Sequence, residues 1–282
     1  MGKYIYCITK GAVPRDLGEI GLGESPTPVT SIICKDLTVF VSESPTKKYE
    51  LSRKNLIGHQ KVCEEVMKTT SSILPVRFAT VAESEDQIVK KILEARYEKL
   101  EELVDEFDSK VELGLKVLWA QMDKVFEELL CENPLLQKTK ESLLKQDPEK
   151  TYYDRADLGQ KIKEALEKKK KKLSKSIVAD FKSLVVESKE LQLHGDKMIL
   201  NTAFLVDQKN HQNFDTRMWA QMAHFSDLQF KYVGPLPAYN FIEVVIDLEK
   251  GIFNSKKTGV KKVEPAPEPE EVKLKAQGGQ KE

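Results

Sequence analysis

Alternation of apolar and polar positions predicts several strands in the first third of the chain. Residues 3–9 alternate β-branched and aromatic side chains and predict a first strand. Two short β-prone runs, 29–34 and 37–42, are separated by a polar pair of hairpin length. The run 73–80 predicts a further strand. We expect the stretch 11–28 to be an irregular loop, because it is rich in glycine and proline.

Apolar positions spaced three or four residues apart predict helices. One covers about 51–67, and a second begins at Ser84, where the sequence S-E-D-Q matches a capping box, and runs to about residue 107. A third pattern starts at Leu158 and continues for about 30 residues, which corresponds to roughly 40 to 45 Å of helix. A helix of that length is expected to project beyond a small domain.

The order of the remaining elements predicts the fold class. From residue 110 onwards the chain reads strand, helix, strand, strand, helix, strand, which is the βαββαβ order of a ferredoxin-like domain. We therefore predict an α+β protein with a small N-terminal α/β sheet domain at 1–109 and a ferredoxin-like C-terminal domain at 110–248. Long helices at about 121–189 form an insertion in the second domain. The other predicted elements are 111–119, 190–193, 198–206, 214–225 and 228–232. The strands 190–193 and 198–206 form a hairpin around Gly195, where a positive φ is expected.

The stretch 231–245, KYVGPLPAYNFIEVV, joins two apolar, aromatic segments through a Gly-Pro-Leu-Pro corner. Pro235 and Pro237 lack a backbone N–H, which places them at a bend or at a sheet edge. We expect this stretch to close the sheet of the second domain. Residues 249–282 combine low hydrophobicity with prolines and charged residues, so they predict a disordered tail.

Composition narrows the class of protein. The 45 basic and 45 acidic residues cancel, so no overall charge attracts the molecule to nucleic acid or to an anionic membrane. No apolar run approaches the roughly 18 residues of a membrane span. The N-terminus lacks the apolar core of a signal peptide, and we expect a cytoplasmic protein. The four cysteines, which have no C-x-x-C spacing, are expected to be reduced thiols.

The sequence contains none of the common catalytic or nucleotide-binding motifs. His59 and Cys63 are four residues apart and would share a helix face, as a base and a nucleophile do. No third orienting group is evident, so we favour a packing role for this pair. The four histidines have no metal-ligand spacing. We therefore predict no catalytic residue, no cofactor and no metal.

Two basic features leave alternatives open. Arg77, between Val76 and Phe78, is expected to pair with a carboxylate or a carbonyl, and the alternative is an anion or partner site. The five lysines of 168–172 are spread around a helix, which favours a solvated face. Their alternative role is in a nucleic-acid- or anion-binding ferredoxin-like module. The strands lack the basic-Gly-aromatic motif of an RNA-recognition module.

Four stretches taken together resemble the gas vesicle protein GvpF/GvpL family. They are KYIYCIT at 3–9, ILPVRFATV at 73–81, KVELGLKVLW at 110–119, and NTAFLV at 201–206 with GPLPAYNF at 234–241. The chain departs from the family pattern at Ala79, Leu236 and Ala238. The lysine-rich helical insert and the C-terminal tail are less typical of the family.

This resemblance implies a non-enzymatic accessory protein of gas vesicle assembly. Its expected partners are the small hydrophobic shell protein GvpA and other gas vesicle proteins, and its expected location is the cytoplasm, in association with the vesicle. A shell subunit must keep apolar surface out of water before it polymerises, and strand addition at a sheet edge with aromatic pockets is one way to shield it. The candidate partner-binding residues are Arg77, Phe78, Pro235, Pro237, Tyr239, Asn240 and Phe241.

Overall fold

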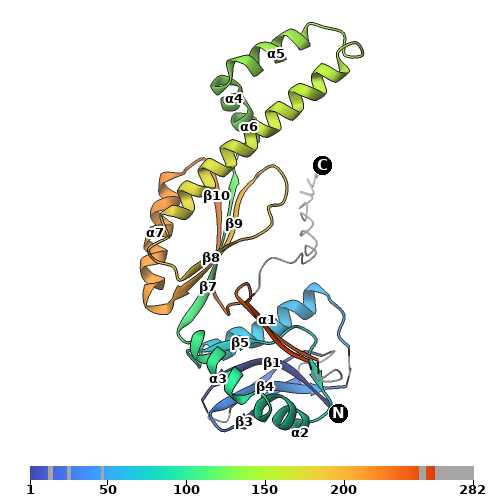
Figure 1. Cartoon of the computed structure of the whole chain (residues 1–282), viewed down its shortest axis with the longest axis vertical. Helices are drawn as coiled ribbons and strands as arrows, with labels where there is room; N and C mark the ends of the chain where they lie inside the picture. Colours follow the sequence, from blue (N-terminus) through green and yellow to red (C-terminus); the bar gives the residue numbers. More distant parts are fainter. Residues whose placement is uncertain (12–14, 24–26, 46–47, 248–251, 258–282) are drawn as a thin grey trace, which may run out of the picture.

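The computed structural model describes residues 1–11, 15–23, 27–45, 48–247 and 252–257. It is a mixed α+β structure with two main antiparallel sheets, which lie one above the other in Figure 1, and a helical arm beyond the second sheet. The α+β class predicted from the sequence is confirmed.

The first sheet is built around β1 (Gly2–Lys10), which pairs with β4, β5 and β6. The strand order is β2-β3-β4-β1-β5, and β6 also pairs with β1. The predicted loop at 11–28 is wrong in part, because β2 lies within it and pairs with β3. The predicted strand at 73–80 is also shorter than expected: β5 ends at Pro75, and Ala79 further on has a positive φ of 66°. The strands are β1 (Gly2–Lys10), β2 (Asp16–Gly21), β3 (Thr27–Cys34), β4 (Leu37–Ser44), β5 (Ile73–Pro75) and β6 (Val81–Ala82).

Helices cover both faces of this sheet. On one face α1 (Arg53–Met67) packs against Tyr4 and Tyr6. On the other face α2 (Glu85–Ile88), the π-helix η1 (Val89–Glu94) and α3 (Tyr97–Glu106) pack against Ile5 and Ile8 of β1. Tyr4 and Ile5 thus enter different cores, as neighbouring residues of a strand do. A register shift between Ile5 and Cys7 then lets Ile5 and Ile8 share one core. The single helix predicted at 84–107 is interrupted, although Ser84 caps its start as expected.

The second sheet has the order β10-β7-β9-β8, and all neighbouring pairs are antiparallel. The helix α7 (His211–His224) and the C-terminal part of the long helix α6 (Tyr152–Ala179) share a core with this sheet, in which Phe181, Phe204 and Phe214 are fully buried. Gly195, in the turn between β8 and β9, has the positive φ of 71° that the sequence predicts. The strands are β7 (Lys110–Trp119), β8 (Glu187–Glu190), β9 (Met198–Asp207) and β10 (Leu228–Leu236).

The arm consists of α4 (Met122–Glu132), α5 (Pro134–Leu144) and the N-terminal part of α6 (Tyr152–Ala179). At 1.5 Å per residue α6 is about 42 Å long, and Figure 1 shows it leaving the second sheet to reach the far end of the molecule. Leu129 and Leu166 are buried between the helices. Lys169 of α6 pairs with two glutamates of α4, at N···O distances of 2.9 and 3.0 Å.

The C-terminal stretch takes a different course from the predicted one. The strand β10 closes the second sheet but ends at Leu236, just after a cis Gly234–Pro235 bond. The chain then returns to the first sheet, where Phe241 and Val244 are buried in the core that α2, η1 and α3 cover. Val76 and Val244 form a parallel bridge. The stretch therefore joins the two sheets instead of only closing the second. We call residues 237–247 the returning chain.

Two further strands, β11 (Ile242–Asp247) and β12 (Ile252–Lys257), form a separate antiparallel pair. The strand β12 lies inside the segment 249–282 that the sequence assigned to a disordered tail, so that assignment is wrong for 252–257. Residues 258–282 of the predicted tail lie outside the described residues.

Candidate functional site

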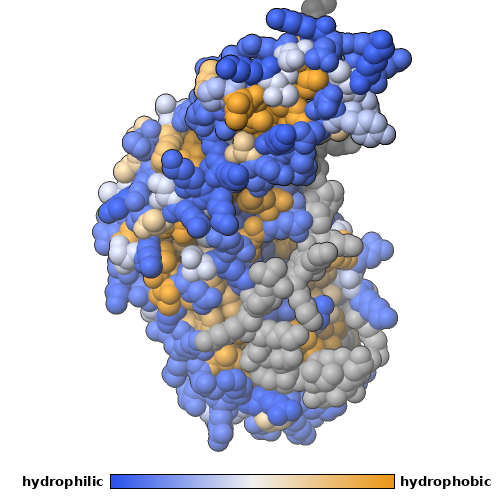
Figure 2. Space-filling view, turned by 45° about the horizontal axis from the view of Figure 1, so that its top comes forward, coloured by the Kyte–Doolittle hydropathy of each residue, from blue (hydrophilic) through white to orange (hydrophobic). Residues whose placement is uncertain are grey.

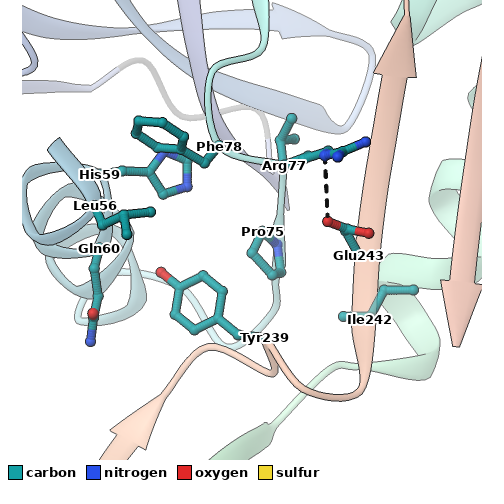
Figure 3. Close-up of a pocket in the computed structure, with 10 residues that line it drawn as sticks. Leu56, His59, Gln60, Pro75, Arg77, Phe78, Tyr239, Ile242 and Glu243 are labelled. Carbon is teal, nitrogen blue, oxygen red and sulfur yellow. Dashed lines mark ion pairs between the residues drawn. The ribbon is translucent and has the colours of Figure 1, made fainter. Parts of the chain in front are cut away.

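A pocket of about 310 Å³ opens where the returning chain meets the first sheet. Three segments line it: helix α1, the residues that follow β5, and the stretch that leads into β11. Figure 3 shows the side chains of these segments converging from three sides. We call this site the junction pocket, and its lining residues are Leu56, His59, Gln60, Pro75, Val76, Arg77, Phe78, Tyr239, Ile242 and Glu243.

Tyr239 projects from the returning chain across the pocket towards α1 (Figure 3). Its hydroxyl oxygen is buried and has no hydrogen-bond partner among the described residues. Burial raises the pKa of Tyr239 well above its ordinary value, so the hydroxyl keeps its proton and remains a donor. An unpaired buried donor costs free energy. Because this oxygen has almost no exposed surface, the pocket presents the ring of Tyr239, and not its hydroxyl, to a ligand.

A polar network holds the wall of the pocket behind His59. The Tyr4 hydroxyl lies 2.9 Å from His59 Nδ1 and accepts a hydrogen bond of 3.0 Å from the Ala79 amide. The Cys63 thiol lies 3.8 Å from His59 Nε2 and 3.6 Å from the Tyr6 carbonyl oxygen. Burial raises the pKa of Tyr4, which keeps this hydroxyl protonated. The network fixes the His59 ring against the sheet.

This arrangement gives His59 and Cys63 a structural role. The sequence showed no third group beside the pair, and the structure supplies Tyr4 in that position. However, the Cys63 side chain has no exposed surface, so a substrate has no access to its sulfur. Burial also raises the pKa of the neighbouring Cys7 thiol. Within the described part of the chain no group of three His, Cys, Asp or Glu side chains is arranged to hold a metal.

Arg77 lies at the opposite end of the junction pocket from α1. Its Nε is 3.8 Å from Glu243 Oε1, and its backbone N–H donates to the Val244 carbonyl oxygen at 2.9 Å. The ion pair that the sequence favoured is therefore present. Both side chains are substantially exposed, at 62% and 40%, so the pair contributes little stability and leaves the guanidinium accessible.

A buried clamp next to the pocket fastens the returning chain to the second sheet. Asn240 donates twice to Glu112 of β7, from its backbone N at 2.7 Å and from Nδ2 at 2.6 Å. Lys189 Nζ donates to the Asn240 carbonyl oxygen at 2.8 Å. Gly234 passes so close to β7 that a Cβ there would lie 2.9 Å from the Glu112 carbonyl oxygen. The strands β7 and β8 and the chain around Asn240 thus meet at the Glu112–Asn240 pair.

Burial raises the pKa of Glu112, and the two hydrogen bonds from Asn240 oppose this effect. Because its folded-state pKa lies above the ordinary value, the Glu112 carboxyl lowers the stability of the fold as the pH rises through that interval. The alternation of this strand assigns Glu112 to the face opposite Val111 and Leu113, so local periodicity does not reveal this role. The available signal was a lone carboxylate in the otherwise mostly apolar run KVELGLKVLW.

The predicted partner-binding residues are divided among four environments. Arg77, Phe78 and Tyr239 line the junction pocket. Asn240 belongs to the clamp, Pro237 and Phe241 are buried, and Pro235 is exposed on β10 at the sheet edge. Sequence reasoning missed the contributions of Leu56, Gln60 and Ile242 to the pocket, because these contacts depend on the return of the chain to the first sheet.

The fold and the pocket define a mixed α+β protein whose two antiparallel sheets are joined by a returning C-terminal stretch. The sequence profile of the gas vesicle synthesis protein GvpL/GvpF family matches residues 2–243. The chain belongs to this family, whose members take part in gas vesicle formation.

Individual relatives cover nearly the same span. Gas vesicle protein F of Nostoc sp. strain PCC 7120 is 26% identical over 86% of this chain and 98% of its own length. Gas vesicle protein L1 of Halobacterium salinarum is 23% identical over 85% of this chain and 90% of its own. The crystal structure of GvpF from Anabaena sp. PCC7120 superposes with a TM-score of 0.74 at 25% identity, over 84% of this chain and 96% of that one.

A second crystal structure, GvpF from Microcystis aeruginosa, has a TM-score of 0.69 at 24% identity, over 85% of this chain and 98% of that one. This second comparison shows that the two proteins share the fold. None of the described helices combines the length and the apolar character needed to cross a membrane.

Proposed function

We propose that the chain is a non-enzymatic accessory protein of gas vesicle assembly. In this proposal it binds the hydrophobic shell protein GvpA in the cytoplasm and assists its nucleation or its incorporation into the growing vesicle. Membership of the GvpL/GvpF family supports the assembly role. The junction pocket supports the binding role, because it combines apolar and aromatic walls with an accessible guanidinium.

The proposed contact is a side chain of the shell protein inserted between Phe78 and Tyr239. Apolar pockets with a few placed polar groups are the usual form of such sites. Arg77 would hold a carboxylate or carbonyl of the bound segment at the rim. Burial of one large apolar side chain contributes about 1.5 to 3 kcal/mol.

Pocket binding is better supported than strand addition, either beside Arg77 or along β10. The backbone N–H of Arg77 is already bonded to Val244, so that position has no free donor for a new strand. The strand β10 is an edge strand, but Lys231 and Pro235 lie on it, and both residue types discourage pairing with another chain. The pocket is therefore the site that we assign to the partner.

We also propose a domain division for the chain. The second sheet has the spatial order β10-β7-β9-β8, and along the chain helices follow β7 and β9. This arrangement supports a ferredoxin-like domain that begins at residue 110 and carries the helices of about 121–189 as an insertion. The N-terminal domain would comprise residues 1–109 together with the returning stretch that packs on it.

A substitution that fills the pocket tests the binding proposal. Gln60→Trp places a large ring on the α1 side of the pocket without removing a core contact. The matched control is Lys61→Trp, on the same helix at an exposed position that does not line the pocket. Each variant is co-expressed with tagged GvpA, and its co-purification is measured after circular dichroism has shown a wild-type fold.

We expect Gln60→Trp to reduce co-purification at least tenfold and Lys61→Trp to leave it within twofold of wild type. A second variant, Arg77→Glu, tests the rim, with Arg96→Glu on the exposed start of α3 as its control. A folded Gln60→Trp variant that retains the shell protein as well as Lys61→Trp does would contradict the proposal.

A further inference from the structure

A second concave surface lies on the helical arm, far along the chain from the junction pocket. It is a groove of about 970 Å³ between α6, the α4–α5 connection and the end of α7. Its apolar lining includes Leu135, Leu136, Leu173 and Phe225. The Leu135 side chain, in the first turn of α5, is 80% exposed. Figure 2 shows apolar patches on the arm within a hydrophilic surrounding.

The border of this arm groove is positively charged. Residues 161–176 of α6 contain eight lysines and two glutamates. Lys161, Lys168 and Lys172 all line the groove, and a spacing of seven and four residues places them on one face of the helix. Lys161 pairs with Asp157, whereas Lys168 and Lys172 have no carboxylate at ion-pair distance in the described part of the chain. The groove thus presents an apolar floor beside unpaired positive charge.

We propose that the arm groove binds an amphipathic α-helix of a partner protein, whose apolar face covers Leu135 and Leu173 and whose acidic border faces Lys168 and Lys172. The α6 residues that line the groove extend from Lys161 to Ser176, which corresponds to about 22 Å, or four turns of a partner helix. Helix-in-groove recognition of this kind depends on apolar anchors at i, i+3, i+4 and i+7, with charges that fix the register.

The same observations argue against nucleic acid as the occupant. In the run 168–172, Lys169 pairs with two glutamates of α4, and Lys170 is 4% exposed and pairs with Glu167. The lysines therefore do not form one continuous phosphate-binding track. A sugar-phosphate backbone is polar and charged and would leave the apolar floor of the groove without an apolar partner. The apolar face of a helix complements this floor.

The experiment uses the full-length chain and a fluorescent synthetic peptide of 18 residues. The peptide carries leucines at i, i+3, i+4 and i+7, glutamates beside them, and alanines elsewhere. One control peptide is a scrambled sequence of the same composition, and a second has lysine in place of glutamate. Binding is measured by fluorescence anisotropy near physiological ionic strength. We expect the acidic amphipathic peptide to bind at least tenfold more tightly than either control.

Matched variants locate the site. Leu135→Gln, and Lys168→Gln combined with Lys172→Gln, should each weaken peptide binding about tenfold. The control combines Lys171→Gln with Lys175→Gln, which removes the same charge from exposed positions outside the groove and should change the affinity less than twofold. Co-purification of GvpA should be unaffected by the Leu135 variant, so this test and that of the junction pocket succeed or fail separately.

Three results would overturn the inference. The first is equal binding of the scrambled peptide, which would show that charge alone is recognised. The second is a single-stranded DNA 15-mer that binds more tightly than the peptide and is weakened equally by both lysine pairs. The third is displacement of the acidic peptide by a synthetic peptide of residues 258–282 at equal concentration, which would identify the tail of this chain as the occupant.

Discussion

The junction pocket and the arm groove are both concave and partly apolar, but different interactions maintain them. The junction is assembled from segments more than 100 residues apart, and a buried carboxylate and buried aromatic rings hold them together. The arm is assembled from helices that are adjacent in sequence. A few buried leucines, such as Leu129 and Leu166, and exposed ion pairs hold these helices together. The junction should therefore be sensitive to single substitutions, and the arm should tolerate changes of charge.

The largest effect is expected at Phe241, which is 3% exposed in the core shared by the returning chain and the first sheet. Phe241→Ala removes a buried ring and should lower the free energy of unfolding by about 3 to 5 kcal/mol. Urea denaturation monitored by circular dichroism measures this change. Trp219→Ala is the control, because Trp219 is 61% exposed on α7 and its loss should cost less than about 0.5 kcal/mol.

If Phe241→Ala is as mild as Trp219→Ala, the returning chain does not pack as described. This result also bears on the choice of binding variants, because substitution of Phe241 tests the stability of the core and not the contact with a partner. For that reason the pocket is tested at Gln60, where the core remains intact.

A pH-dependent effect is expected at the clamp. Asn240→Asp replaces the Nδ2 donor with a carboxylate beside Glu112, and the loss of the hydrogen bond together with like-charge repulsion should cost about 2 to 3 kcal/mol at pH 7. The repulsion raises the pKa of both carboxyls in the folded protein above their unfolded values. The folded state then holds more protons in that interval, so its stability falls as the pH rises through it.

Urea denaturation of wild type and Asn240→Asp at pH 7.5 and at pH 5 measures this dependence. The difference between the two proteins should be largest at pH 7.5 and should shrink at pH 5. A difference that is the same at both pH values would show that Glu112 and residue 240 do not interact through charge.

The smallest effect is expected in the arm. Lys169→Met keeps the aliphatic part of the side chain but removes both ion pairs to α4, and it should lower stability by no more than about 1 kcal/mol. The difference from wild type should decrease further in 0.5 M NaCl, because salt screens exposed charges. A loss comparable to that of Asn240→Asp would remove the contrast between the two regions.

Local patterns predicted those parts of the fold that depend on local interactions. The alternating run at residues 111–119 predicted β7, the capping box at Ser84 predicted a helix start, and the turn at Gly195 predicted a positive φ. The projecting helix followed from its length. In contrast, β2 was missed, because its run DLGEIG carries two glycines and no buried alternation.

The site itself was only partly predictable. Its aromatic residues were selected because rings near a proline corner must pack somewhere, and Tyr239 does line the pocket. Nothing in local periodicity indicates that residues 237–247 return to the first sheet, because that path is decided by long-range packing of Phe241 and Val244. The burial of Glu112 follows from the same return, since its hydrogen-bond partner Asn240 lies 128 residues away.

The most direct test of the central claim is site-specific photo-crosslinking during co-expression with GvpA. A benzoylphenylalanine is introduced at position 60 in the junction pocket, at position 61 beside it, or at position 135 on the arm. We predict a crosslink to GvpA from position 60 and none from positions 61 and 135. Crosslinks from position 135 alone, or equal crosslinks from positions 60 and 61, would contradict the assignment of the shell protein to the junction pocket.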